Sequence, residues 1–373
     1  MRGRRDKYLT FGGGSLIYNP SDASLEWLVR SMQSEDLRSC EQILKRLVGS
    51  VVPDVFAGFE REVCEGATRG GDTRHFRDLS EWAQWLSWSS VVLDERDYLM
   101  AAVHALRLAH ELAATDYGTA RRRDLGQLWT DTIRGFLGEI TFVNWLKSRF
   151  DVGAELDFRK GRLEEFLPSD IRSVAGRRPN LKISIKTTKL DGVWLDIPGA
   201  QIRHSDVFVL VRVGVTREHF IAFLKSISVI REKILEKAFE LKMISSEDLE
   251  DMWKRIPEFT KIPAYVAGFF DRREHNDRLR RGQRVLEVGG DIKGRRRRLV
   301  INRFLGFWDP RYDEYRDLVL RRYQELNPSA RVSGELDIEF EGIGDFSREL
   351  HFIASSGVLR RLKGDWESII REL

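Results

Sequence analysis

Three ionisable side chains near the middle of the chain have the chemistry needed to hydrolyse a phosphodiester bond. Glu139 lies in a run with helical spacing, Asp170 lies in the segment PSDI, and Lys186 lies in the segment ISIKTT. Carboxylates hold Mg²⁺, a lysine orients or activates water, and a cation stabilises the negative charge that develops on phosphate. We therefore predict that Asp170 and Glu139 bind Mg²⁺ and that Lys186 acts on the attacking water.

Glu139 belongs to a predicted helix over residues 128–147, where apolar side chains recur at three- and four-residue spacing. Gly135 and Gly138 interrupt this helix, although glycine in a helix costs about 1 kcal/mol relative to alanine. We therefore expect another backbone or a ligand to approach closely beside Glu139.

Lys186 belongs to a predicted strand over residues 181–190, where apolar and polar side chains alternate. Side chains two residues apart lie on the same face of a strand. Ser184 and Lys186 are therefore expected on one face, and Ile183 and Ile185 on the other, toward a core. Lys186 should point into a cleft.

The dipeptide Asp191-Gly192 predicts a two-residue turn that leads into a second strand over residues 193–198. In the resulting hairpin, Asp196 would lie on the face away from Lys186, which favours Glu139 as the second carboxylate. A one-residue bulge near Asp191 would bring Asp196 round to Lys186. The choice between Glu139 and Asp196 therefore stays open.

This constellation resembles the restriction-endonuclease superfamily, the PD-(D/E)xK nucleases. In that family an Asp that ends one strand and an acid-x-Lys on the next strand form a metal site. The matching residues here are Pro168-Ser169-Asp170, Ser184-Ile185-Lys186, and Gly138-Glu139 on the preceding helix. Two positions depart from the pattern, because Ser169 separates Pro168 from Asp170 and Ser184 stands where the family usually has an acid. We assign Ser184 to the wall of the catalytic site.

The resemblance covers residues 135–200 and extends weakly to two predicted strands that follow, DVFVLVRV at 206–213 and HFIAFL at 219–224. It implies a cytoplasmic Mg²⁺-dependent endonuclease for double-stranded DNA, and among family members a sequence-specific type II restriction enzyme, commonly a homodimer. It leaves open whether one or two Mg²⁺ ions bind.

An arginine-rich stretch at residues 272–303 gives a second indication of nucleic acid. It holds twelve Lys and Arg against four Asp and Glu, in a chain whose net charge is only +4. Such a local excess is typical of a surface that binds a polyanion, and the guanidinium group suits both phosphates and guanine edges. We expect phosphate contacts from Arg295, Arg296, Arg297 and Arg298, and base contacts from one or more of Arg280, Arg281 and Arg284.

Composition and patterning predict a globular protein of mixed α/β class. Hydrophobic residues make up 42% of the chain, with 10 Trp and 21 Phe, which is enough for sizeable cores. No segment approaches the roughly 18 apolar residues that span a membrane. Cys40 and Cys64 show neither zinc-ligand spacing nor a disulfide framework, so we expect a reducing cytoplasm.

The coarse pattern divides the chain into three parts. Residues 1–118 form a mainly helical N-terminal domain, in which Trp82, Trp85 and Trp88 are expected to fill a core rather than stack on bases. Residues 119–328 are predicted to form a core of mixed β-sheet flanked by helices, with a helical insertion at 227–255, and the resemblance implies that this core is nuclease-like. Residues 329–373 form a C-terminal β-hairpin and helix that pack on this core.

Two other functions remain open from the sequence. The first is a nucleic-acid-binding or regulatory protein on a nuclease-like scaffold that has lost its catalytic acid, with Ser184 as the trace of that loss. The second is a repair nuclease that recognises DNA structure rather than sequence.

Overall fold

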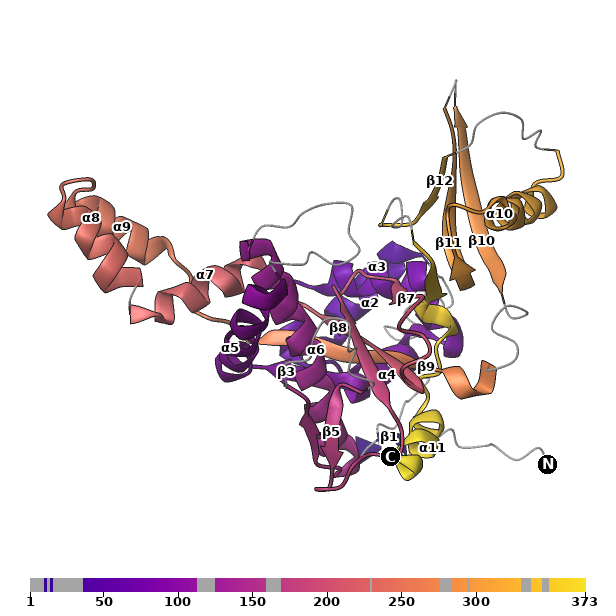
Figure 1. Cartoon of the computed structure of the whole chain (residues 1–373), viewed down its shortest axis with the longest axis horizontal. Helices are drawn as coiled ribbons and strands as arrows, with labels where there is room; N and C mark the ends of the chain where they lie inside the picture. Colours follow the sequence, from indigo (N-terminus) through magenta and orange to yellow (C-terminus); the bar gives the residue numbers. More distant parts are fainter. Residues whose placement is uncertain are drawn as a thin grey trace.

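The computed structural model describes residues 10–11, 14–15, 36–112, 125–158, 169–228, 230–275, 283–293, 296–329, 337–343 and 349–373. Helices and mixed β-sheets alternate through these ranges, and the N-terminal part is largely helical (Figure 1). The mixed α/β class expected from the sequence is therefore confirmed.

The described helices fall into an N-terminal group, a long central helix, a helical arm and a C-terminal group. Their bounds are α2 (Leu37–Leu47), α3 (Glu60–Gly70), α4 (Leu79–Ser89), α5 (Glu95–Leu112), α6 (Leu125–Phe150), α7 (Arg217–Ser226), α8 (Glu236–Glu240), α9 (Ser246–Arg255), α10 (Asp313–Leu326) and α11 (Lys363–Glu372). Short 3₁₀ turns, among them η2 (Asp72–His75) and η5 (Ser356–Val358), and a π-helical turn, η3 (Ile230–Leu235), connect them.

The central sheet has the strand order β3 (Ser90–Leu93), β9 (Ile262–Asp271), β8 (Val207–Val213) and β6 (Ile183–Thr188). Strand β6 is parallel to β8, whereas β8 and β9 are antiparallel. Every residue of β8 and β9 is buried, as expected for strands that are covered on both faces. Helix α6 packs on this sheet and contacts β6, β8 and β9 (Figure 1).

A small hairpin joins the edge of the central sheet where β6 begins. It consists of β4 (Ala154–Leu156) and β5 (Ile171–Val174), which are antiparallel. The backbone N–H of Asp170 donates to the carbonyl of Ile183 at 2.8 Å, and the N–H of Asp157 donates to the carbonyl of Asp170 at 2.9 Å. These bonds fix Asp170 beside the start of β6.

A second sheet carries the arginine-rich stretch. Its order is β10 (Arg284–Lys293), β11 (Arg296–Trp308), β13 (His351–Ser355) and β7 (Trp194–Pro198), and β12 (Asp337–Phe340) pairs with β11. Helix α10 packs on β10 and closes a separate hydrophobic core with Trp308 and Tyr323. Figure 1 shows this unit at one end of the molecule and the arm of α7–α9 at the other.

Two local predictions are wrong. Strand β7 pairs with β13 and belongs to the second sheet, so the predicted hairpin ladder with the strand of Lys186 does not form. The segment HFIAFL at 219–224 was expected as a strand but lies in α7. Its buried residues, His219, Ala222 and Phe223, have the i, i+3, i+4 spacing of a helix face, which outweighs its β-branched and aromatic content.

The predicted N-terminal domain shares its hydrophobic core with the central sheet. Trp82 and Trp85 are 1% and 0% exposed, and the same core continues to Trp366 in α11. Strand β3, which the sequence pattern does not predict, adds an N-terminal strand to the central sheet. The predicted boundary at 118/119 lies outside the described residues. The tryptophans fill a core, as expected.

A buried ionic network ties the N-terminal helices to the central sheet and to the segment before α11. Arg212 of β8 pairs with Asp72 at 2.6 Å, and its guanidinium also donates to the carbonyl of Gly66 at 3.0 Å and to Tyr265 Oη at 2.7 Å. Arg361 approaches the other oxygen of Asp72 at 3.2 Å. Asp72, Arg212 and Arg361 are all 0% exposed.

The expectation that the two cysteines stay unpaired is wrong. Cys40 of α2 and Cys64 of α3 form a disulfide, and both residues are fully buried. Their spacing along the chain does not indicate this pairing, because the contact depends on how α2 packs on α3. Separately, none of the described helices is long and apolar enough to cross a membrane.

Candidate active site

Asp170 is held in place by hydrogen bonds from the strand that carries Lys186. Its Oδ2 accepts the backbone N–H of Ile185 at 2.5 Å, and the Ser184 hydroxyl donates to the same carboxylate. Ser184 was expected only to form the site wall. In the structure it binds the predicted metal ligand directly. Pro168, the first residue of the matched motif, lies outside the described residues.

Lys186 is half-buried and lines a cleft of about 490 Å³. Its Nζ donates to Gln201 Oε1 at 2.8 Å. Gln201 lies in the turn after β7, and sequence reasoning missed it, because no local pattern links it to Lys186. Its carbonyl oxygen fixes the ammonium group without neutralising its charge.

Glu139 is delivered to the site by close packing of α6 on β6. Thr187 Oγ1 donates to the carbonyl of Gly135 at 3.1 Å. A Cβ atom at Gly138 would lie only 1.9 Å from that Oγ1. The expected close approach beside Glu139 is confirmed, and the approaching group is β6 itself.

The electrostatics show that the three predicted residues act on one another. Burial raises the pKa of Glu139 well above its usual value; the charge of Asp170 raises it further, and Lys186 works in the opposite direction. Burial also raises the pKa of Asp170, while Lys186 and the bonds from Ile185 and Ser184 partly offset this effect. The structure therefore brings Glu139, Asp170 and Lys186 together from three separate elements.

The residues of this cluster fit a divalent cation of the Mg²⁺ type. Two neighbouring carboxylates in a desolvated site repel each other, and a bound cation removes that repulsion. Mg²⁺ usually takes only one or two protein carboxylates and completes its shell with waters and substrate phosphates. The described part of the chain holds no group of three or more acidic, His or Cys side chains arranged to bind a metal, so the fit depends on the pair Glu139 and Asp170.

Asp157 is a third carboxylate near the cluster. It is 8% exposed, and its charge raises the pKa values of both Glu139 and Asp170. Sequence reasoning missed it because it follows β4 without any recognisable motif. Its backbone bond to Asp170 explains why it lies there.

Asp196 is placed differently from the hairpin expectation. It lines the same cleft as Lys186, but it lies on β7 in the second sheet and its Oδ1 is 2.7 Å from His351 Nδ1. The argument against Asp196 assumed a hairpin ladder between the strand of Lys186 and β7, and that ladder does not form. Glu139 nevertheless remains the better candidate, because the charges of Asp170 and Lys186 both act on its pKa, whereas Asp196 has a histidine partner.

Four of the predicted DNA-contact arginines, Arg284, Arg296, Arg297 and Arg298, lie on the ribbon formed by β10 and β11. Arg284 is exposed at the start of β10 and borders a cavity of about 440 Å³ with Arg321 and Arg322 of α10. Arg298 is 55% exposed and pairs with Glu339. Arg296 and Arg297 belong to β11, whereas Arg280, Arg281 and Arg295 lie outside the described residues.

Part of the positive charge of this stretch is balanced within the protein. Arg272 pairs with Asp206, Arg273 pairs with Asp271 and Glu372, and Arg303 is 11% exposed beside Glu287. The local excess counted from the sequence therefore overstates the charge available to a ligand.

Gly138→Ala and Gly135→Ala should have opposite effects. The new Cβ at 138 would collide with Thr187, and overpacking of this kind costs about 1–3 kcal/mol. At 135 a Cβ meets no atom within 4 Å, so alanine should gain up to about 1 kcal/mol of helix stability. Thermal unfolding of both variants measures this. Equal effects at the two positions would show that α6 does not pack on β6 as described.

Comparisons with known proteins found no matching family model, no matching curated protein and no matching solved structure.

Proposed function

We propose that the protein is a Mg²⁺-dependent endonuclease that hydrolyses phosphodiester bonds in double-stranded DNA. The observation that carries this proposal is the convergence of Glu139, Asp170 and Lys186 at one edge of the central sheet, where the charges of Asp170 and Lys186 act on the pKa of Glu139 and the charge of Lys186 acts on the pKa of Asp170. The resemblance of their sequence pattern to the PD-(D/E)xK nucleases supports the same reaction.

Each residue has a defined task in this proposal. Asp170 and Glu139 would hold Mg²⁺, which supplies a Lewis acid for the phosphate and lowers the pKa of a bound water. Lys186, fixed by Gln201, orients the attacking water and offsets charge on the phosphate. Ser184 and the Ile185 N–H keep the Asp170 carboxylate in one orientation.

The finer assignments belong to the same proposal. We propose a sequence-specific type II restriction enzyme that works as a homodimer in the cytoplasm and reads DNA with the β10–β11 ribbon. The Cys40–Cys64 disulfide is unusual for a reducing compartment. Its complete burial hinders attack by thiol reductants.

Sequencing the ends produced from long unmethylated DNA in Mg²⁺ tests this proposal. A sequence-specific enzyme gives discrete fragments whose ends share one sequence. A smear of unrelated ends would favour the structure-specific repair nuclease instead. Intact DNA at every Mg²⁺ concentration would contradict the nuclease assignment.

A non-catalytic DNA-binding protein is the second candidate, and Ser184 is the observation that favours it. The serine occupies the position of the usual acid and donates a hydrogen bond to Asp170. A protein of this kind would bind DNA without Mg²⁺-dependent cleavage, so parallel binding and cleavage assays separate the two candidates.

Glu139→Gln should lower cleavage more than Asp196→Asn. Glutamine removes the negative charge that is coupled to Asp170 and Lys186, whereas asparagine at 196 changes a group that is bonded to His351. Both variants keep the size of the side chain, so initial cleavage rates compare them directly. An inactive Asp196→Asn protein beside an active Glu139→Gln protein would make Asp196 the metal ligand.

A further inference from the structure

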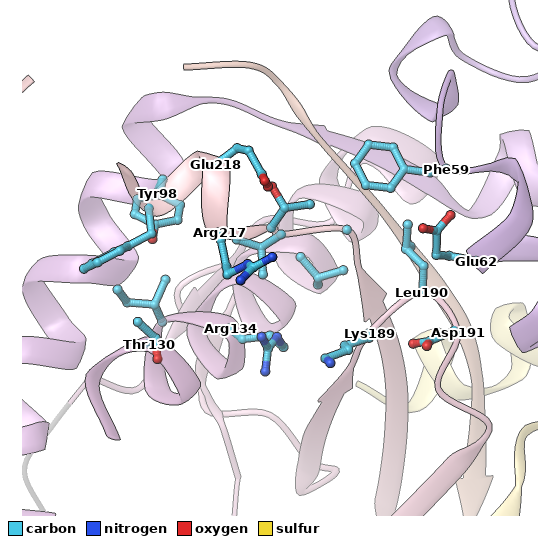
Figure 2. Close-up of a pocket in the computed structure, with 16 residues that line it drawn as sticks. Phe59, Glu62, Tyr98, Thr130, Arg134, Lys189, Leu190, Asp191, Arg217 and Glu218 are labelled. Carbon is cyan, nitrogen blue, oxygen red and sulfur yellow. The ribbon is translucent and has the colours of Figure 1, made fainter. Parts of the chain in front are cut away.

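A second cavity, of about 560 Å³, lies beside the cleft of Lys186 (Figure 2). Helix α6 contributes Thr130, Ile133 and Arg134 to its lining, and the segment after β6 contributes Lys189, Leu190 and Asp191. The segment between β8 and α7 forms a further wall. The volume lies within the range of about 300–1,000 Å³ that is typical of pockets for small ligands.

Three cations line this cavity and form few interactions with other groups of the protein. Figure 2 shows Arg134, Lys189 and Arg217 projecting from three different segments into the cavity. Lys189 and Arg217 are exposed and form no ion pair within the described part of the chain. Arg134 reaches only Asp131, at 3.5 Å, and its buried Nε has no hydrogen-bond partner among the described residues.

Three acids also line the cavity. Asp191 lies close to Lys189 in the chain, and Glu62 stands on the opposite wall in Figure 2. A hydrogen bond with Thr216 lowers the pKa of Glu218, so this carboxylate is already bonded at the start of its own helix, α7. The lining thus holds three cations and three acids, which come from α3, from α6, from the segment after β6 and from the start of α7.

The cavity and the cleft of Lys186 are neighbours. Arg134, Lys189 and Asp191 line both of them, and Lys186 lines the cleft. Cationic side chains thus continue from the proposed catalytic cluster into the cavity. A nucleic-acid strand carries a phosphate at every nucleotide, so a strand leaving the cluster would meet these cations in turn.

We propose that this cavity binds a nucleotide of the substrate strand close to the cleaved bond, with its phosphate held by Arg134, Lys189 and Arg217. The inference rests on the proposed function and extends it. It adds phosphate-binding groups that the arginine-rich stretch does not include. The buried side chains of Ile133 and Val213 add apolar surface to the lining of the cavity.

The test is the salt dependence of DNA binding, measured by fluorescence anisotropy with Ca²⁺ in place of Mg²⁺. The variants are Arg134→Gln, Lys189→Gln, Arg217→Gln and the triple variant. Removing one cation that neutralises a phosphate should reduce the log–log salt slope by about 0.9, and the triple variant should show roughly three times that reduction. Arg371→Gln is the matched control, because Arg371 is exposed on α11 and lines neither cavity.

Unchanged slopes in the triple variant, with wild-type cleavage, would overturn the inference and leave the nuclease assignment intact. If the wild-type protein binds DNA but never cuts it, and the variants still show reduced salt slopes, the result would support phosphate binding in the cavity. It would also contradict the nuclease assignment. A wild-type protein that does not bind DNA would contradict both. If Arg134→Gln lowers the unfolding temperature, the exposed Lys189 and Arg217 variants decide the outcome.

Discussion

Lys186→Ala is expected to lower the rate of DNA cleavage by about 100-fold or more while leaving DNA binding nearly unchanged. A positioned catalytic group contributes on the order of 10²-fold or more to the rate. Lys186 faces the cleft, whereas Ile183 and Ile185 are the residues of β6 that fill the core. Initial rates of plasmid cleavage measure the first effect, and anisotropy with Ca²⁺ measures the second.

Lys182→Ala is the matched control for this variant. Lys182 is an exposed lysine just before β6. Its backbone N–H donates to the side chain of Asp206, and its own side chain forms no hydrogen bond with the described residues. It should cleave DNA at the wild-type rate. If the Lys186 variant cuts as fast as the Lys182 variant, Lys186 has no role in the reaction.

Asp72→Asn is expected to destabilise the protein by about 3–5 kcal/mol, because it leaves buried arginines without a counter-charge. Asp72 lies between Arg212 and Arg361, and all three side chains are completely buried. Asp251 of α9 offers a matched control, since it pairs with Arg255 at the same 2.6 Å but is 50% exposed. Asp251→Asn should cost no more than about 1 kcal/mol. Denaturant unfolding of both variants gives the comparison.

The same network predicts how stability depends on pH. Burial alone would raise the pKa of Asp72, but Arg212 and Arg361 overcome this effect and hold that pKa below its usual value. A carboxylate whose pKa is lower in the folded state stabilises the fold above its unfolded pKa. That contribution disappears as the pH falls through the folded value. The stability difference between wild type and Asp72→Asn should therefore shrink below about pH 4, and a difference that stays constant there would contradict the assignment.

Short-range patterns predicted the elements that carry the site. The helical spacing of residues 128–147 indicated α6, and the two glycines inside that helix indicated the close approach at Gly138. The alternation in β6 placed Ser184 and Lys186 on one face, and the structure directs both toward the cluster. These features depend on backbone geometry within one element, which the sequence encodes locally.

Features that depend on long-range packing could not be predicted in this way. The Asp191-Gly192 turn is present, but the strand after it joins β13, more than 150 residues later in the chain. Gln201 and Asp157 reach the site through contacts between elements, and so does the pairing of Cys40 with Cys64. No local pattern indicates that Asp72 and Arg212 form a buried pair, because they lie 140 residues apart in the chain and only the fold brings them together.

The most direct test of the proposed catalytic centre is the conversion of supercoiled plasmid by wild type and Asp170→Asn in Mg²⁺, with and without chelator. Asparagine keeps an oxygen that can accept the N–H of Ile185, so the fold around position 170 should persist. We predict cutting by wild type in Mg²⁺, none with chelator, and a reduction of about 100-fold or more in the variant. Equal cutting by the two proteins, or wild-type cutting that survives the chelator, would contradict a Mg²⁺ centre at Asp170.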